Sequence, residues 1–293
     1  MLIKEEPRLL AFDQKVTSTV ISNEHDFYRP FARSTPIVNG HYSNLAYLIY
    51  VKKAMLMYKQ KAIETGLIKL KEDESIIDHI DLLAMHLPYS KMGKNALAFL
   101  LRHEWRNLPK WKNILAKIGM EEPKPPEGMG TIEAILSDRE FMKKDEEFRR
   151  RFMETEEYKQ VFESKLASSL KASEIIGNLY TGSLYMGFRS EIEYEYKKGR
   201  DLAGFRVGFA SYGSGCSAMA FSGVIQDRYK EVVSRMDLER EIGERRKISM
   251  EEYEQLHRGL RGVEERIVSK SKEFVLVSIG KRGEGFREYV FSN

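Results

Sequence analysis

The sequence predicts an α/β protein, and three observations carry that prediction. Its 293 residues are 42% hydrophobic and 31% charged, a balance typical of a folded chain rather than a disordered one. Short runs rich in β-branched and aromatic residues alternate with longer runs whose apolar residues recur at helical spacing. Such alternation of strands and helices is typical of the α/β class, and the length allows one large domain or two ordinary ones.

The totals exclude several classes of protein. The net charge of +4 comes from 48 basic and 44 acidic residues. This near-balance argues against extensive nucleic-acid binding, although it is compatible with a local basic pocket. No apolar run approaches the roughly 20 residues that cross a bilayer, so we expect no membrane segment. Cys216 is the single cysteine, which rules out an internal disulfide and favours a reducing, cytoplasmic location.

The N-terminal elements are predicted from their apolar patterns. The first 22 residues, with the runs "RLLAF" and "KVTSTVIS", predict a β-hairpin. Residues 26–30, "DFYRP", are predicted to be extended, because the proline keeps its predecessor out of the α region. Residues 43–63 contain no Pro or Gly and carry an apolar face at helical spacing. They predict a helix capped by Ser43.

The middle of the chain predicts a buried strand, a helix and a connector. Residues 80–90 form a short apolar run that a proline ends, and 91–105 predict a helix that begins through Gly93. Residues 106–163 are predicted to be a connector or insertion. They open with four of the chain's eight prolines and continue into a charge-dense stretch with spaced aromatics, which is typical of a solvated helix face.

The C-terminal elements follow the same alternation. A capping box of Ser249 and Glu252 predicts a helix that Gly259 ends. The remaining predicted elements are a helix that begins within 177–188, a strand over 206–215 that runs into a glycine turn, and a hairpin of "EFVLVSI" and "FREYVF" around "GKRGEG".

The run at 177–188, "GNLYTGSLYMGF", has an unusual composition. It looks buried, yet it contains glycines, an asparagine and several hydroxyl groups. Glycine costs about 1 kcal/mol in a helix interior, so a purely structural helix would use Leu and Ala. Either the backbone must approach a neighbour closely there, or the polar groups face a ligand.

His86 is the first candidate for chemistry. It ends a predicted buried strand, where α/β folds expose functional groups, and its near-neutral pKa suits proton transfer or carbonyl polarisation. A hydrogen-bonded core histidine is the structural alternative. Lys91 and Lys94 follow at the start of the next helix, where free N–H groups and ammonium charges together could bind phosphate.

The turn "SYGSG" at 211–215 and the adjacent Cys216 are further candidates. Backbone N–H groups of a glycine turn can point at an oxyanion, although a plain hairpin turn is equally consistent. The spacing fits neither a nucleophile elbow nor a P-loop. Cys216 invites a nucleophile interpretation, but no base lies beside it, so a buried packing role is favoured. Metal-ligand spacing is absent: there is no HExxH and no CxxC.

Five segments taken together resemble the hydroxymethylglutaryl-CoA synthase family, in the family's own order. They are "DFYRP", "PIVNGHYSNLAYL", "DLLAMHLPYSKMGKNAL", "IIGNLYTGSLYMGF" and "LAGFRVGFASYGSGCSAMAFSG". The match covers most of 1–225 apart from the connector. The resemblance implies the C-terminal half of a thiolase-like fold, with a mixed sheet and covering helices. It further implies condensation of acetyl-CoA with acetoacetyl-CoA in the mevalonate route to isoprenoids, with coenzyme A thioesters as substrates and no other cofactor.

The resemblance also implies roles for individual residues. His86 matches the family's catalytic histidine, which would polarise the acetoacetyl carbonyl. Asn178 matches an asparagine that would hydrogen-bond the acyl group. Ser43 and Ser214 match positions that contact substrate, although this chain has Asn39 where the family's motif around Ser43 has an aspartate.

Lys91 and Lys94 match lysines that follow the histidine, but Asn95 replaces a third, which weakens the expected coenzyme A phosphate contact. The family's nucleophilic cysteine and its glutamate base belong to an N-terminal half that this sequence does not contain. Cys216 lies in a different motif and cannot replace the nucleophile. The resemblance is consistent with Met1 being an internal methionine of a longer ancestral reading frame. We expect the polypeptide alone not to catalyse condensation.

Three interpretations stay open. The chain is the C-terminal portion of a synthase, truncated or completed by a second chain that carries the N-terminal half. Alternatively, it is a non-catalytic acyl-CoA-binding or scaffold protein. It could also be a related condensing enzyme that uses carrier-protein thioesters, which the two lysines mildly oppose. The intact family implies a homodimer, and half of such a fold is expected to expose apolar surface and to aggregate or dimerise.

Overall fold

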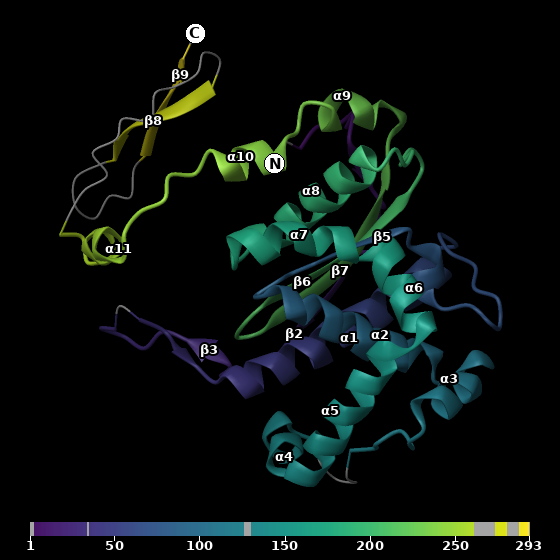
Figure 1. Ribbon diagram of the computed structural model, residues 1–293. Coiled ribbons are helices and arrows are strands. Elements are labelled where there is room, and N and C mark those ends of the chain that lie inside the picture. The colour runs from purple at the N-terminus through teal and green to yellow at the C-terminus, as the bar shows by residue number, and fades with distance from the viewer. Residues whose placement is uncertain (1–2, 34, 126–129, 261–272, 280–286, 293) are drawn as a thin grey trace. The chain divides into compact units, whose positions relative to one another are not determined.

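The computed structural model describes residues 3–33, 35–125, 130–260, 273–279 and 287–292 (Figure 1). The chain divides into two compact units, Met1–Ile242 and Gly243–Asn293. The predicted site residues all lie in the first unit, whose core is the mixed sheet and the helices packed on it.

The sheet of the first unit has the order β1–β7–β6–β5, with β2 also paired to β7. β5 and β6 are parallel, whereas β6 and β7 form an antiparallel hairpin. The sheet is therefore mixed, as predicted. Its strands are β1 (Leu10–Phe12), β2 (Ser18–Ile21), β5 (Leu82–Met85), β6 (Arg206–Gly213) and β7 (Ser217–Ile225).

The predicted hairpin in the first 22 residues is wrong. Leu10 pairs with Ile225 and Ser18 pairs with Ala220, so β1 and β2 lie one after the other along the antiparallel neighbour β7. Asp13 sits between them and donates its N–H to the carbonyl of Ser222 at 2.9 Å. Both segments have strand character, as expected, but their partner is a strand 200 residues away, which local sequence cannot reveal.

The two faces of the sheet bury different residues of the same strands. Leu82 and Ala84 of β5 pack on one face, and Leu83 and Met85 pack on the other. β6 alternates in the same way. This alternation follows from the period of two in a β-strand. Burial of both faces explains why the segment is a continuous apolar run.

Helices cover both faces of this sheet (Figure 1). On one face lie α1 (Gly40–Glu64) and α2 (Ser90–Trp105). On the other lies α8 (Gly182–Lys197), and α7 (Ala167–Ile176) contacts both α8 and α2. Leu184, Phe188 and Ile192 of α8 are spaced four residues apart and are all buried against the sheet, the stripe expected of an amphipathic helix.

The helix predicted over 43–63 begins earlier than expected. Asn39 is its N-cap, and its side chain accepts a hydrogen bond from the N–H of Tyr42 at 3.3 Å. Ser43 is therefore a residue of the first turn, not the cap. Gly93 likewise lies inside the first turn of α2 rather than before it. A Cβ there would stand 2.7 Å from Cδ2 of Leu170, so the glycine permits close packing of α2 on α7.

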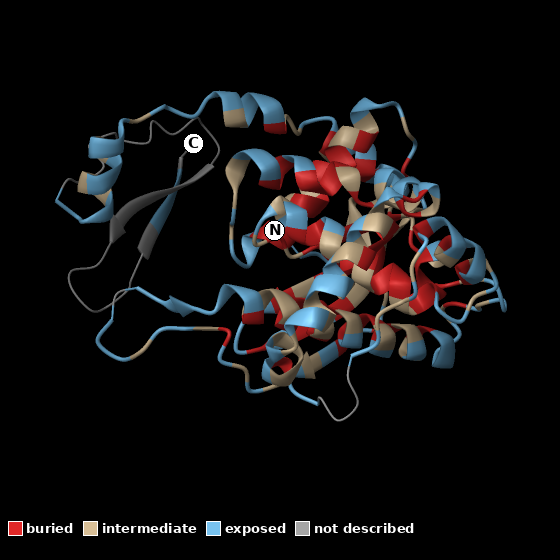
Figure 2. Cartoon of the chain, turned by 60° about the horizontal axis from the view of Figure 1, so that its bottom comes forward, coloured by how far each residue is buried: buried red, intermediate tan, exposed pale blue. Residues whose placement is uncertain are grey.

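The segment 106–163 is mostly helical. Its charge-dense part buries one aromatic stripe: Phe148 and Phe152 are fully buried and pack against Trp105 and Trp111. Figure 2 shows how buried residues gather where helices and sheet pack together, with exposed residues on the outward sides of the helices. The solvated helix face that the charges predict is the opposite side of the same helices. The helices are α3 (Lys110–Ile118), α4 (Ile132–Ser137), α5 (Arg139–Glu154) and α6 (Glu156–Lys165).

Several short elements complete the first unit. The segment "DFYRP" contributes β3, which pairs with β4 as a small antiparallel ribbon. The bounds are β3 (Phe27–Tyr28), β4 (Ile37–Val38), the 3-10 helices η1 (Ile76–His79) and η2 (Asp227–Tyr229), α9 (Lys230–Val233) and α10 (Leu238–Gly243).

The second unit contains α11 (Met250–His257) and the antiparallel pair β8 (Glu273–Ile279) and β9 (Arg287–Ser292). Ser249 caps α11 by accepting from the N–H of Glu252 at 3.1 Å, as predicted. The late hairpin is also confirmed, although its expected turn at 280–285 lies outside the described residues. Within the parts of the chain that the structure describes, no helix is long and apolar enough to span a bilayer.

Candidate functional site

His86 follows the last residue of β5 and is fixed through its backbone. Its N–H donates to the carbonyl of Ala210 at 2.8 Å, which extends the pairing of β5 with β6 by one residue. Its carbonyl accepts from the hydroxyl of Tyr47 at 2.7 Å. The side chain therefore projects from a rigid strand end rather than from a loose loop, the position that the sequence predicted.

The imidazole of His86 is held by a serine that the sequence did not single out as a site residue. The Oγ of Ser183, in the first turn of α8, lies 2.8 Å from Nδ1 of His86. The same oxygen accepts from the N–H of Leu87 at 3.1 Å and lies 2.8 Å from the carbonyl oxygen of Tyr180. Ser183 is only 3% exposed, so this contact is shielded from water.

Burial lowers the pKa of His86 to about 4, against an opposing contribution from the Tyr180 carbonyl. The ring is therefore neutral at physiological pH. A neutral imidazole donates from one nitrogen and accepts at the other. Such a group can polarise a carbonyl or exchange a proton with a substrate. A buried, hydrogen-bonded ring is equally what a core histidine would show, so the functional role of His86 stays a prediction.

A second cluster is organised by Asp26, which is fully buried. Its carboxylate accepts from the hydroxyl of Ser43 at 3.0 Å, the hydroxyl of Tyr212 at 2.9 Å and the N–H of Gly215 at 2.9 Å. One side chain thus joins the "DFYRP" segment, helix α1 and the β6–β7 turn. Sequence reasoning missed it. A charged group inside an aromatic motif is the available signal, because buried carboxylates require partners.

The "SYGSG" segment is the last part of β6 and the start of the tight turn to β7. The N–H of Gly215 is engaged by Asp26 and does not point at a ligand, which supports the hairpin interpretation for that group. Ser214 is exposed at the tip of this turn. Asp26 therefore fixes both predicted serines, Ser43 directly and Ser214 through its neighbour.

Cys216 is buried, and its backbone pairs with Ser22 in both directions, at 2.7 and 3.1 Å. Burial raises the pKa of its thiol to about 11, with further contributions from the charges of Glu24 and Asp26. A thiol with so high a pKa is a poor nucleophile at neutral pH. The geometry agrees with the packing role that the sequence favoured.

A tyrosine joins the two clusters. The ring of Tyr47 meets that of Tyr212 edge to face, with centroids 5.1 Å apart, while its hydroxyl binds the backbone of His86. Contacts therefore run without a break from Ser43 through Asp26, Tyr212 and Tyr47 to His86. The structure brings these residues into one connected group from segments that lie far apart in the chain.

Asn178 and the two lysines lie at the edge of this group. Asn178 is exposed, and its Oδ1 accepts from the N–H of Tyr180 at 2.7 Å, an Asx-type turn that leads into α8. Lys91 and Lys94 are exposed on the first turns of α2, the helix that follows His86. The Nζ of Lys94 lies 5.1 Å from the ring centre of Phe162.

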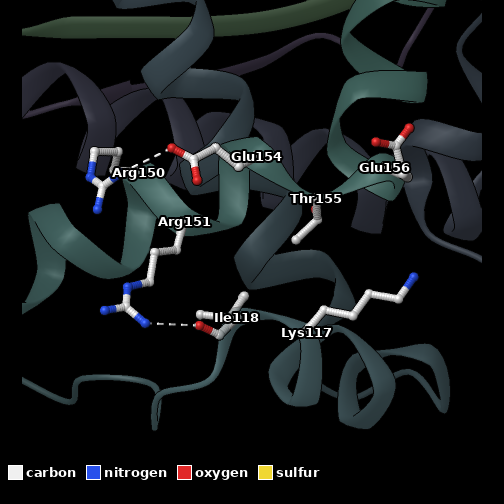
Figure 3. Close-up of a pocket in the computed structure, with 7 residues that line it drawn as sticks. All are labelled: Lys117, Ile118, Arg150, Arg151, Glu154, Thr155 and Glu156. Carbon is white, nitrogen blue, oxygen red and sulfur yellow. Dashed lines mark hydrogen bonds and ion pairs between the residues drawn. The ribbon is translucent and has the colours of Figure 1, made fainter.

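A surface hollow of about 540 Å³ lies elsewhere, between α3, α5 and α6 (Figure 3). Its charged groups are paired: Arg150 contacts Glu154 at 3.0 Å, and Arg151 donates to the carbonyl of Ile118 at 3.3 Å. It contains none of the predicted site residues. Its lining consists of Lys117, Ile118, Arg150, Arg151, Glu154, Thr155 and Glu156.

With this geometry established, comparison with known proteins decides the family. Residues 10–274 match the family model described as "Hydroxymethylglutaryl-coenzyme A synthase C terminal". The chain belongs to this family. The resemblance carried by the five sequence motifs is thereby confirmed, and the match also extends through the 106–163 segment.

Curated hydroxymethylglutaryl-CoA synthases are similar to this chain. The Haloferax volcanii synthase is 27% identical over 300 residues, which cover 99% of this chain and 62% of the relative. The mitochondrial Bos taurus synthase is 29% identical over 265 residues, covering 87% and 49%. The chain thus spans about half to three fifths of the length of these synthases.

Solved structures show the same fold. MvaS in complex with 3-hydroxy-3-methylglutaryl coenzyme A is 28% identical, has a TM-score of 0.69, and is matched over 99% of this chain and 60% of its own. PksG, an HMG-CoA synthase from Bacillus subtilis, is 19% identical with a TM-score of 0.64, covering 99% and 60%, and supports the fold alone. The predicted thiolase-like α/β fold, with its mixed sheet and covering helices, is confirmed.

Proposed function

We propose that this chain supplies the C-terminal part of a hydroxymethylglutaryl-CoA synthase that condenses acetyl-CoA with acetoacetyl-CoA. The observation that carries the proposal is His86, a neutral imidazole at a rigid strand end whose Nδ1 is held by the buried Ser183. This arrangement leaves Nε2 to meet a ligand. In the proposed reaction Nε2 polarises the ketone carbonyl of the acetoacetyl group. The carbon of that carbonyl is the atom that is attacked.

The other predicted site residues surround this group in the proposal. Asn178 donates from its Nδ2 to the acyl portion, while its Oδ1 keeps the turn with the N–H of Tyr180. Ser43 and Ser214 contact substrate from α1 and from the β6–β7 turn. Asp26 supports the proposal because its bonds to Ser43 and Gly215 fix both segments beside Tyr212.

The coenzyme A thioesters are the only small molecules that the proposal requires. Lys91 and Lys94 are exposed at the start of α2, and the cap residue Tyr89 makes no side-chain bond to that helix end. Ammonium groups beside free N–H groups favour a phosphate. Asn95 in place of a third lysine predicts a weaker contact than a three-lysine site would give.

A Claisen-type condensation also needs a nucleophile that carries the acetyl group and a base that removes a proton from its methyl. Cys216 does not qualify, because it is a buried thiol with a raised pKa. The proposal therefore assigns both missing groups to the N-terminal half of the synthase, within a longer polypeptide or on a second chain. The assembled enzyme is proposed to be a homodimer.

The test measures release of coenzyme A from acetyl-CoA and acetoacetyl-CoA. The polypeptide alone is expected to show no turnover above background. With the N-terminal half supplied, His86→Ala is expected to lose about two to four powers of ten in rate. An unchanged rate in that variant contradicts the role of His86. Turnover by the chain alone that Cys216→Ala abolishes contradicts the assignment of the missing nucleophile.

A carrier-protein substrate is the second candidate. Asn95 replaces a lysine, and Lys94 rests over the ring of Phe162, so the phosphate site is weaker than three free lysines would make it. The solved Curacin pathway HMG synthase was crystallised with a donor acyl carrier protein. The test compares the rate of condensation with acetoacetyl-CoA against the rate with the same acyl group on a carrier protein. The faster of the two identifies the substrate.

A non-catalytic acyl-CoA-binding role predicts tight binding of acetoacetyl-CoA with no turnover even when the N-terminal half is present. The quickest test is to read the DNA upstream of the start codon. A neighbouring segment that encodes the cysteine and glutamate motifs would favour the synthase over the non-catalytic protein.

A place in the mevalonate pathway and a cytoplasmic location complete the proposal. The single cysteine supports the reducing compartment, although several relatives, the Bos taurus and Homo sapiens synthases among them, are mitochondrial.

A further inference from the structure

Basic side chains gather where α1 meets the last turns of α2. Phe99, His103 and Arg106 are spaced four and three residues apart, so they lie along one face of α2 and its C-cap. Lys52 of α1 meets this face, because its Nζ lies 5.6 Å from the ring centre of Phe99. We call Lys52, His103 and Arg106 the basic cluster.

Lys52 has no acidic partner, although its side chain is half-buried. In the parts of the chain that the structure describes, no carboxylate lies within ion-pair distance of its ammonium group. Lys59, seven residues further along the same helix, shows the contrast, because its Nζ contacts Glu104 at 2.8 Å. Burial lowers the pKa of Lys52, and the charges of Lys53 and Arg106 lower it further. The fold thus places like charges beside this ammonium group and supplies no counter-ion.

His103 adds a titratable donor to the cluster. Burial lowers the pKa of its ring, and the charges of Lys52 and Arg106 lower it further. Glu104 and Glu122 act in the opposite direction. The three basic groups are therefore close enough for their charges to act on one another. Glu122 already accepts from Nε and Nη2 of Arg106, at 3.0 and 2.5 Å, which leaves Nη1 for another acceptor.

We propose that the basic cluster binds a phosphate group, with Lys52 supplying the main charge and His103 and Arg106 supplying further donors. A phosphate monoester carries close to two negative charges at neutral pH and has three strong acceptor oxygens, so it can accept from both helices at once. A guanidinium N–H suits phosphate geometry. The C-terminal end of α2 opposes binding with roughly half a negative charge, which the unpaired charges of Lys52 and Lys53 exceed.

This site is separate from the coenzyme A phosphate contact proposed for Lys91 and Lys94. His103 follows Lys94 in α2 by a distance of about 14 Å along the helix axis. Lys94 lies over the ring of Phe162 of α6, whereas the basic cluster faces α1. Phosphate binding at the cluster therefore needs neither acyl-CoA nor the N-terminal half of the synthase.

The experiment titrates the full chain with sodium phosphate at constant ionic strength and follows the ring protons of His103 by NMR. The chain has six histidines, and His103→Gln identifies the signals. We expect a saturable shift that sodium chloride does not produce, because the dianion favours the charged form of the ring. Lys52→Gln should weaken binding by about tenfold or more, since it removes a charge-assisted contact. Lys52→Arg keeps the charge and should keep the affinity.

Lys112→Gln is the matched control, because Lys112 is exposed on α3 and lies outside the cluster. It should leave the phosphate affinity unchanged. Adenosine monophosphate carries the same group on a nucleotide, so tighter binding than that of inorganic phosphate identifies a nucleotide as the ligand, and equal or weaker binding identifies phosphate itself. Absence of a saturable shift in wild type, or equal phosphate affinity in Lys52→Gln and Lys112→Gln, overturns the proposal. Neither outcome bears on whether the assembled enzyme condenses acyl-CoA.

Discussion

Replacing Asp26 with alanine should destabilise the first unit strongly, because this carboxylate ties three elements together. The substitution removes the acceptor for the hydroxyls of Ser43 and Tyr212 and for the N–H of Gly215. Tyr212 is 6% exposed, so its hydroxyl loses its carboxylate acceptor where water has little access, at about 1–3 kcal/mol. Ser43 and Gly215 are more accessible and can bind water, so each adds about 0.5–1 kcal/mol.

These contributions sum to a loss of about 3 kcal/mol in the free energy of unfolding. Asp26→Asn should lose about half as much, because its amide oxygen still accepts from Gly215 and its amide group can donate to the two hydroxyls. Both tryptophans, Trp105 and Trp111, lie in the first unit. Their fluorescence during urea or thermal unfolding therefore reports on this unit without interference from the second.

For a unit of this size, about 3 kcal/mol corresponds to a fall in Tm of roughly 6–12 °C. The control is Asp73→Ala, which removes an exposed carboxylate and should change stability by less than about 0.5 kcal/mol. A loss below about 1 kcal/mol for Asp26→Ala, or one equal to that of the control, would refute the reasoning. It would show that the three donors form hydrogen bonds with water in the variant about as favourably as they do with Asp26 in the wild type.

Three further predictions test other parts of the structure. Because the pKa of Cys216 is about 11, only about 0.1% of its thiol is ionised at pH 8, so a thiol reagent should label the folded chain far more slowly than the urea-unfolded chain; equal rates contradict its burial. As pH falls from about 6.5 to about 4, the unfolded chain binds a proton at His86 that the folded chain does not. The free energy of unfolding should therefore fall by up to about 3 kcal/mol more in wild type than in His86→Gln. If the two proteins lose the same free energy over this pH range, the pKa of His86 is not lowered. Gly93→Ala should cost about 1–2 kcal/mol, because its Cβ would stand 2.7 Å from Leu170, whereas Gly40→Ala, with open space around it, should not destabilise.

The sequence predicted the parts of the fold that local patterns determine. The buried strand before His86 is a continuous apolar run that a proline ends, and β5 lies inside it. The α11 helix was predicted from the Ser249 cap, which the structure contains. In both places the residues that specify the element are neighbours in the chain, so periodicity and capping chemistry suffice.

Sequence reasoning failed where the partner of a residue lies far away. The first two strands pair with β7 rather than with each other, because β7 has a free edge that an antiparallel neighbour can extend. Ser43 was expected to cap α1, yet its hydroxyl binds Asp26 from inside the helix. A serine near a helix start suits both roles, and only the position of Asp26 decides between them.

The candidate site divides in the same way. His86 stood out because it ends a predicted buried strand and lies in a motif that resembles the family's histidine motif. Asp26 and Ser183 did not, because they act on residues such as Tyr212 and His86, which are 186 and 97 positions away. The side chains that could carry the chemistry were thus predictable from motifs, whereas the side chains that orient them became visible only once the sheet was assembled.

The unusual composition of 177–188 follows from this arrangement. A Cβ at Gly187 would lie 3.5 Å from the carbonyl oxygen of Ser169 and 3.8 Å from that of Met85, so even a methyl group would be in van der Waals contact with both backbones. Bulk at this position would push α8 away from the end of β5 and move Ser183 away from His86. The small residues therefore set the distance between α8 and the end of β5. Only some of the hydroxyl groups face inward: Ser183 is buried, whereas Tyr180 is 66% exposed. Close backbone approach and a polar contact with the site are both needed in this run, at different residues, because the helix that approaches the strand also carries the side chain that holds the histidine.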